Sequence, residues 1–172
     1  MSAILIASVE ELFAHALTML SDAGECYEQL ADQMEIANNP EVSKIFRWLA
    51  EKQQQRTRYI EALAGDAQLP HISPWDHHWE HGLNPQAPDT DVTHYMMTPY
   101  HALAMAAAAE RSAAAYFKQL TDADAQADLC RLAAEFSATA ADFAVVLEQR
   151  LSEQPAPEQD WDKDHDPPVV LE

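Results

Sequence analysis

The chain has 172 residues, of which 48% are hydrophobic and only three are glycine, and its formal net charge is −19. This length fits one domain with a substantial core, and the composition is typical of a compact, mostly helical protein. The acidic charge argues against binding to nucleic acid or to an anionic membrane, because those partners require cationic side chains that neutralise phosphate.

The first residues, MSAILIASVEEL, do not have the pattern of a targeting segment. They lack a positively charged start, and their apolar run is too short for a signal peptide. No run elsewhere approaches the roughly 18 apolar residues of a membrane span. Cys26 and Cys130 both fall inside helical patterns rather than in a CxxC pair, so we expect reduced, buried thiols in a cytoplasmic protein.

Two helices are predicted in the first part of the chain. Ser8 followed by Glu11 is a capping-box signal, and an apolar stripe then continues to residue 36. A second helix is predicted from Pro40 to the stop signal at Gly65. The inward stripes are Phe13, Ala16, Leu20, Ala23, Tyr27, Leu30 and Met34 in the first helix, and Val42, Phe46, Leu49, Gln53, Arg56, Ile60 and Leu63 in the second.

Two further helices are predicted after a long connection. Residues 66–97 hold four of the ten prolines and show no clean period, which indicates a connection. Thr98 before Pro99 opens a third helix, and a fourth is predicted from about 122–124 to about 151. Their stripes are Leu103, Ala106, Glu110, Ala113, Phe117 and Leu120, and Leu129, Leu132, Phe136, Thr139, Phe143 and Leu147.

The two helix pairs are similar to each other. YEQL at 27–30 matches FKQL at 117–120, and WLAEK at 48–52 matches RLAAE at 131–135. Two short-looped hairpins joined by one long crossover form a four-helix bundle of the ferritin-like kind. We therefore predict an all-α bundle of four antiparallel helices over residues 1–152, with the crossover linker at 66–97. The tail, 153–172, is acidic and contains prolines, so we expect it to be extended and mobile.

Residues 30–63, LADQMEIANNPEVSKIFRWLAEKQQQRTRYIEAL, resemble the rubrerythrin-like branch of the ferritin-like superfamily. There a hairpin runs through LA, an acidic loop, PE and then LFxxLAxEExxH. The resemblance extends over about residues 9–64 and 98–151. In that family each hairpin supplies a Glu seven residues before an aromatic residue of its first helix, and an ExxH pair on its second. These six ligands hold two irons that react with oxygen or peroxide.

Carried over to this chain, the resemblance implies that only one ligand survives, at Glu110. The side chains at the other positions cannot replace carboxylates and imidazoles around two cations. A shifted register, with Glu51 and Glu135 facing inward, would rotate a helix by about 100° to 200° and expose Leu49 or Leu132. We therefore expect no cofactor in the bundle, and iron only if the family activity survives. The six former ligand positions in the core are Leu20, Gln53, Arg56, Glu110, Phe136 and Thr139.

The same comparison predicts an ion pair in the core. The family geometry brings Arg56 and Glu110 toward a shared centre, where the guanidinium fork can bind a carboxylate through two bonds. We expect Gln53 to donate a further hydrogen bond. The alternative is that Arg56 extends its stem to a helix end while Glu110 reaches solvent.

The linker contains a cluster of histidines in the sequence HISPWDHHWEHG. His71, His77, His78 and His81 lie within eleven residues of one another. Neutral imidazoles at this density can bind copper, nickel or zinc. No family spacing is matched, and the alternative is a surface loop that its tryptophans fix to the bundle.

Three functions remain open at this point. The surviving pattern favours a ferritin-like bundle that has lost its redox site and acts as a non-catalytic binding or interaction module. The alternatives are a rubrerythrin-like iron oxidoreductase with an atypical ligand set, and a metal-binding protein that uses the His-rich linker. Ferritin-like bundles commonly pair side by side, so the resemblance also implies a homodimer, besides an unidentified protein partner.

Overall fold

The computed structural model describes residues 6–73, 76–77, 79, 83–121 and 126–164. Regular structure in these residues consists of four long helices, α1 (Val9–Ile36), α2 (Pro40–Ala64), α3 (Pro99–Gln119) and α4 (Ala127–Ser152), and the 3-10 helix η3 (Thr90–Val92). The described residues contain no strand. The all-α, four-helix prediction is therefore confirmed at this level.

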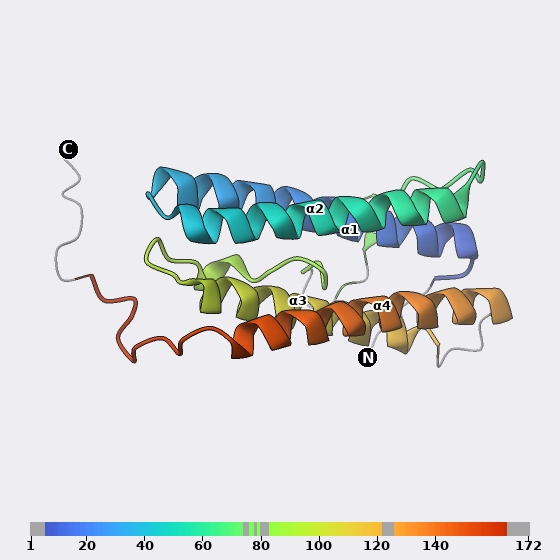
Figure 1. Ribbon diagram of the computed structural model, residues 1–172. Coiled ribbons are helices and arrows are strands. Elements are labelled where there is room, and N and C mark those ends of the chain that lie inside the picture. The colour runs from blue at the N-terminus through green and yellow to red at the C-terminus, as the bar shows by residue number, and fades with distance from the viewer. Residues whose placement is uncertain (1–5, 74–75, 78, 80–82, 122–125, 165–172) are drawn as a thin grey trace.

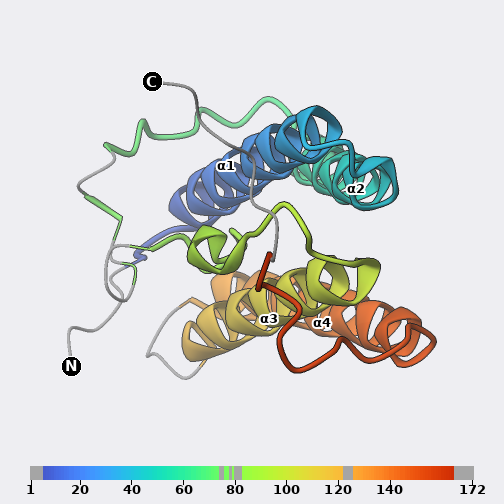
Figure 2. The same cartoon turned by 90° about the vertical axis from the view of Figure 1, so that its left-hand side faces the viewer.

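The four helices form two hairpins that stack as two layers (Figure 1). One layer is α1 with α2, and the other is α3 with α4. Helices α2 and α3 run in the same direction, so the connection between them returns along the length of the bundle. The end view shows this connection beside α1 and α3, whereas α2 and α4 line the opposite side (Figure 2).

Local sequence signals explain where the helices begin and end. At the start of α1 the Ser8 hydroxyl accepts a hydrogen bond from the backbone N–H of Glu11 at 3.1 Å. Helix α2 ends at Gly65, whose φ of 56° lies in the left-handed region that glycine adopts without steric cost. Helix α4 begins at Ala127. This is a few residues later than predicted, and the predicted start at 122–124 lies outside the described residues.

The core is close to the predicted stripes, with three corrections. All stripe residues of α1 and α3 are buried. Leu63, expected inside, is 41% exposed, because it lies in the last turn of α2. Thr139 is also exposed, and Phe143 is only half-buried. The small side chains of Ala140 and Ala144 take the inward positions of α4 instead, which turns Thr139 to the edge of the helix interface.

Two other expectations concern hydrophobicity and thiols. Among the described residues, no helix combines the length and the apolar character that crossing a membrane requires.

Cys26 and Cys130 form no disulfide with each other, but each is only partly buried, not fully buried as expected. Burial raises the pKa of the Cys26 thiol, so this thiol stays protonated at neutral pH.

The described part of the acidic tail lies against the bundle through one aromatic side chain. The Trp161 ring centroid lies 3.7 Å from that of His101 and 5.6 Å from that of His94. The Tyr95 hydroxyl donates a hydrogen bond to the Asp164 carboxylate. Within the described residues, the tail therefore contacts the segment around the start of α3. Residues 165–172 lie outside the described part.

His101 should titrate below the usual range, with a consequence for stability. Its Nδ1 accepts a hydrogen bond from the backbone N–H of Thr98 at 3.0 Å, and burial lowers the pKa of His101 from 6.5. The folded state therefore binds this proton less tightly than the unfolded state, and the protein should lose stability as the pH falls from 6.5 through the lowered value.

An NMR titration of the ring carbons tests this prediction. The pKa of His101 should lie below 6.5 in the wild type, and Trp161→Ala should raise it by uncovering the ring. A wild-type pKa at or above 6.5 would contradict the burial that the structure gives this imidazole.

Candidate functional site

A carboxylate is buried at the centre of the bundle. Glu110 lies on the inward stripe of α3 between Ala106 and Ala113, and it is only 1% exposed. Its surroundings on α3 are apolar. An ionised carboxylate in such a place is strongly destabilising unless a cation and hydrogen-bond donors compensate for the lost water.

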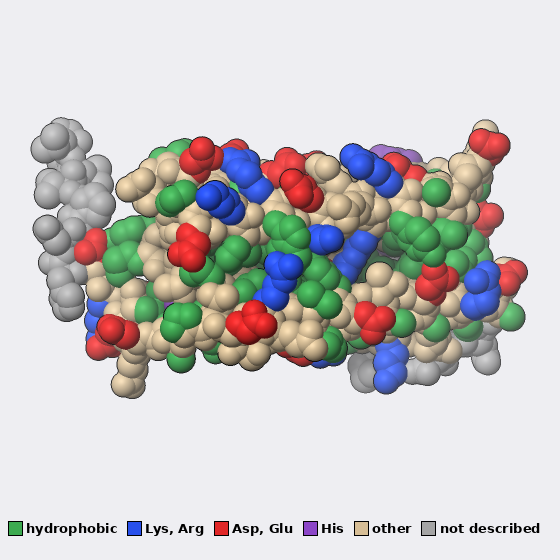
Figure 3. Space-filling model, in the orientation of Figure 1, with side chains coloured by type: hydrophobic (Ala, Val, Ile, Leu, Met, Phe, Trp, Pro, Cys, Tyr) green, Lys and Arg blue, Asp and Glu red, His purple; other side chains and the backbone are tan. Residues whose placement is uncertain are grey.

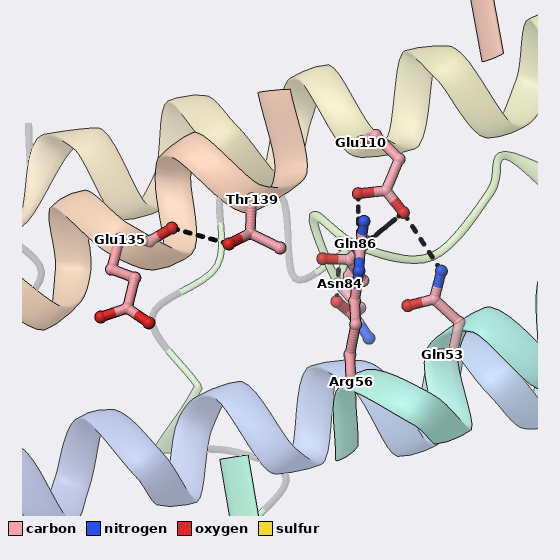
Figure 4. A network of polar contacts seen from close by, with 7 residues as sticks. All are labelled: Gln53, Arg56, Asn84, Gln86, Glu110, Glu135 and Thr139. Atoms are coloured by element: carbon pink, nitrogen blue, oxygen red, sulfur yellow. Dashed lines mark hydrogen bonds and ion pairs between the residues drawn. The ribbon is translucent and has the colours of Figure 1, made fainter. Parts of the chain in front are cut away.

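Three side chains supply these donors (Figure 4). Arg56 Nη1 donates to both carboxylate oxygens of Glu110, at 3.0 Å to Oε1 and 2.8 Å to Oε2. The side-chain amide of Gln53 donates to Oε1 at 3.1 Å, and that of Gln86 donates to Oε1 at 2.8 Å. The structure thus brings together the predicted residues of the ion pair. One guanidinium nitrogen serves both oxygens, however, in place of the predicted two-nitrogen fork.

Arg56 is held on its other side by an aromatic ring. Its side chain is 16% exposed, and its guanidinium carbon lies 4.7 Å from the ring centroid of Phe143 on α4. This is a cation–π distance, which further stabilises a partly desolvated guanidinium. The alternative arrangement, with Arg56 and Glu110 extending apart toward solvent, therefore does not occur.

The connection contributes a donor, Gln86, that the sequence did not indicate. Gln86 is 2% exposed, and its backbone N–H donates to Asn84 Oδ1 at 2.9 Å. The Asn84 amide in turn donates to the carbonyl of Met19 at 2.9 Å, on α1. An Asn bonded to the N–H two residues later forms an Asx-turn. The Asn84-Pro85 pair was a turn signal, but no sequence signal pointed the following glutamine into the core.

The network is not fully satisfied within the described residues. The Tyr27 hydroxyl and Gln53 Oε1 are buried there without a hydrogen-bond partner. Burial, followed by the nearby charge of Glu110, raises the pKa of Tyr27 well above 10, and Arg56 opposes this only in part. Tyr27 is therefore a neutral phenol over the whole physiological range.

The other positions that the resemblance matches to metal ligands line a small cavity beside the network. Its volume is about 40 Å³, and its walls include Leu20, Arg56, Gln86, Phe136 and Thr139. Pockets that hold small-molecule ligands usually measure about 300 to 1,000 Å³. A larger, open groove of about 350 Å³ lies on the outside between α1 and α2, away from the buried carboxylate. The cavity beside Glu110 is therefore much smaller than such pockets.

These residues do not fit a di-iron centre. Both oxygens of the one carboxylate, Glu110, are already bonded to donors, and Arg56 brings a fixed positive charge that repels a metal cation. The shifted register does not supply other ligands. Glu51 is exposed, and Glu135 accepts a hydrogen bond from the Tyr59 hydroxyl at 2.6 Å, on the side of the bundle formed by α2 and α4.

The predicted linker site is only partly described. His71 is exposed, whereas Nδ1 of His77 lies 3.2 Å from Nδ1 of His15 on α1. His78 and His81 lie outside the described residues. Over the part of the chain that the structure describes, no three His, Cys, Asp or Glu side chains are grouped so that they could hold a metal ion. Of the two linker histidines that the structure describes, it brings His77 to another imidazole.

Replacing Arg56 by Ala should lower the free energy of unfolding by about 3 kcal/mol, because the buried Glu110 charge would lose its cation. The double variant Arg56→Leu/Glu110→Leu should lose much less, since it removes the charge with its partner. Urea unfolding followed by circular dichroism measures both. Arg58→Ala, at an exposed arginine of α2, is the matched control and should change stability by no more than about 0.5 kcal/mol. Equally small losses in the single and double variants would show that the pair carries no such energy.

Comparison with known proteins identifies no relative of this chain. No family model, no curated protein and no solved structure matches the chain.

Proposed function

We propose that this protein is a ferritin-like, rubrerythrin-related bundle that has lost its di-iron chemistry and acts in the cytoplasm as a non-catalytic binding or interaction module. The observation that carries this proposal is the 2.8 Å contact between Arg56 and Glu110. In a di-iron protein, metal cations neutralise the carboxylates at the centre of the bundle. Here a guanidinium has that electrostatic role, and amides from α2 and the connection complete it.

The alternative, an iron oxidoreductase with an atypical ligand set, makes a different prediction for iron. When the metal-free protein is mixed with ferrous iron and then with oxygen, we expect no near-ultraviolet oxo-iron band, because Arg56 repels cations from the one carboxylate available. Two irons per chain after desalting would contradict the proposal if they are lost in Glu110→Gln, the matched variant that removes only the charge.

The uneven covering of the bundle supports an interaction role. The connection lies along the α1–α3 side (Figure 2). The opposite side, which we call the α2–α4 surface, carries partly exposed Trp48 and Phe143, with ring centroids 5.8 Å apart, and Val146, which is 41% exposed. Arg150 lies over the Trp48 ring at 4.1 Å. Hydrophobic and basic side chains gather along the line where the two hairpins meet (Figure 3). Mixed aromatic and basic surfaces of this kind are typical of protein interfaces.

The distribution of charge supports a second copy of this chain as the partner at the α2–α4 surface. Five of the ten Lys and Arg residues lie on α2, at Lys44, Arg47, Lys52, Arg56 and Arg58, although the net charge is −19. In a two-fold pair, the basic side chains of α2 in one copy can meet carboxylates of α4 in the other, such as Glu135 on the same surface. We propose a homodimer that pairs through the α2–α4 surface, as the family resemblance also implies.

Light scattering after size exclusion tests the homodimer. We expect a dimer mass for the wild type and a monomer for Val146→Asp, because a carboxylate at the centre of the interface would be desolvated. Ile36→Asp is the matched control, since Ile36 is 88% exposed at the end of α1 and outside the α2–α4 surface. A monomeric wild type, or equal dissociation by the control substitution, would contradict this interface.

A further inference from the structure

Two imidazoles join α1 to the connection on the covered side of the bundle. His15 lies on α1 and is only 6% exposed. Its Nδ1 lies 3.2 Å from Nδ1 of His77. The two rings meet edge to face, with centroids 5.2 Å apart and planes at 76°. A buried imidazole of α1 therefore meets an imidazole from a segment far along the chain.

The separation of the two nitrogens suits a shared metal ion. A tetrahedral zinc ion with Zn–N bonds of about 2.0 to 2.1 Å places two ligand nitrogens about 3.3 to 3.4 Å apart. The observed 3.2 Å between His15 and His77 is therefore within a few tenths of an ångström of that value. Either ring nitrogen of a neutral histidine can be the ligand.

We propose that His15 and His77 bind one divalent ion of the zinc, copper or nickel class through their Nδ1 atoms, with water in the remaining positions. Imidazole is a good ligand for all three metals. Metal binding replaces the contact between the rings, and the ring that carried its proton on Nδ1 takes the other neutral tautomer, with the proton on Nε2. This site differs from a cluster of linker histidines alone, because half of it belongs to the bundle. The inference does not depend on the proposed interaction role.

The surroundings hold His77 in place. The His77 ring stacks on Trp79, with centroids 4.1 Å apart and planes at 14°, and Trp79 packs against the core cluster that contains Leu20 and Phe117. His77 is thus positioned by the bundle.

A metal at this pair would fasten the connection to α1. The same connection carries Gln86 to the buried Glu110 carboxylate. Binding to the folded state alone must raise the thermal stability of the protein. Metal affinity and the unfolding temperature are therefore two independent readouts of one site.

Calorimetry on the full chain, freed of metal by chelation and titrated with zinc, tests the proposal. We expect one ion per chain and a higher unfolding temperature. His15→Gln and His77→Gln should each weaken binding by at least about tenfold, since even outer-shell changes have effects of that size. His71→Gln, at the exposed linker histidine, is the matched control and should bind as the wild type does. Copper should quench tryptophan fluorescence, and Trp79→Phe should remove most of that quenching.

Three outcomes would overturn the inference. Absence of binding to the wild type would mean that the two rings form only a hydrogen bond. If His77→Gln bound zinc with the affinity of the wild type, the His15–His77 pair would not be the metal site. Loss of binding in His71→Gln to the same extent as in His77→Gln would move the site to the linker. His77 lies in the connection and not in a helix, so its variant decides the question even if His15→Gln does not fold.

Discussion

A carboxylate that is buried in a four-helix bundle must be neutralised, and the donors for Glu110 come from two other segments of the chain. Helix α2 provides Arg56 and Gln53, one turn apart, and the connection provides Gln86. All three side chains donate hydrogen bonds to the carboxylate. The two hairpins are thereby tied together at mid-length by polar groups as well as by apolar packing. Such a pair need not stabilise the fold relative to an apolar core, but it fixes which side chains face one another.

The charge of Glu110 explains why a guanidinium lies at this point. In a metal-containing bundle the inward ligands are anionic or neutral and the cation is inorganic. Here the inward stripe of α3 carries a single Glu among apolar residues, which needs one positive charge, and Arg56 supplies it from α2. The Phe143 ring then covers the outer side of the guanidinium. The network is thus a self-consistent alternative to a metal centre, which is the physical basis of the proposed non-catalytic role.

Helix periodicity and capping signals were sufficient for much of this arrangement. The ends of α1 and α2 follow from Ser8, Pro40 and Gly65, and the 3.6-residue period turns Gln53, Arg56 and Glu110 inward. The same period misplaced Thr139, because the choice between neighbouring inward positions depends on how closely α4 approaches its partners. Small residues such as Ala140 allow a close approach, which a stripe of large apolar residues does not reveal.

Contacts from irregular segments could not be predicted in this way. Gln86, His77 and Trp161 all lie in segments without a helical period, so their partners are determined by tertiary packing alone. His15 was missed for a related reason, since a single histidine inside a helical stripe gives no sign of the residue it meets. The histidines of the linker therefore indicated where metal ligands could lie, but the pairing of His15 with His77 could be found only in the three-dimensional structure.

A crystal structure grown with excess ferrous iron, with anomalous diffraction recorded at the iron edge, tests the central claim most directly. The account predicts no anomalous peak between α2 and α3, with Arg56 still bonded to both oxygens of Glu110. A peak at that place, with Glu110 as a ligand and Arg56 displaced, would contradict it.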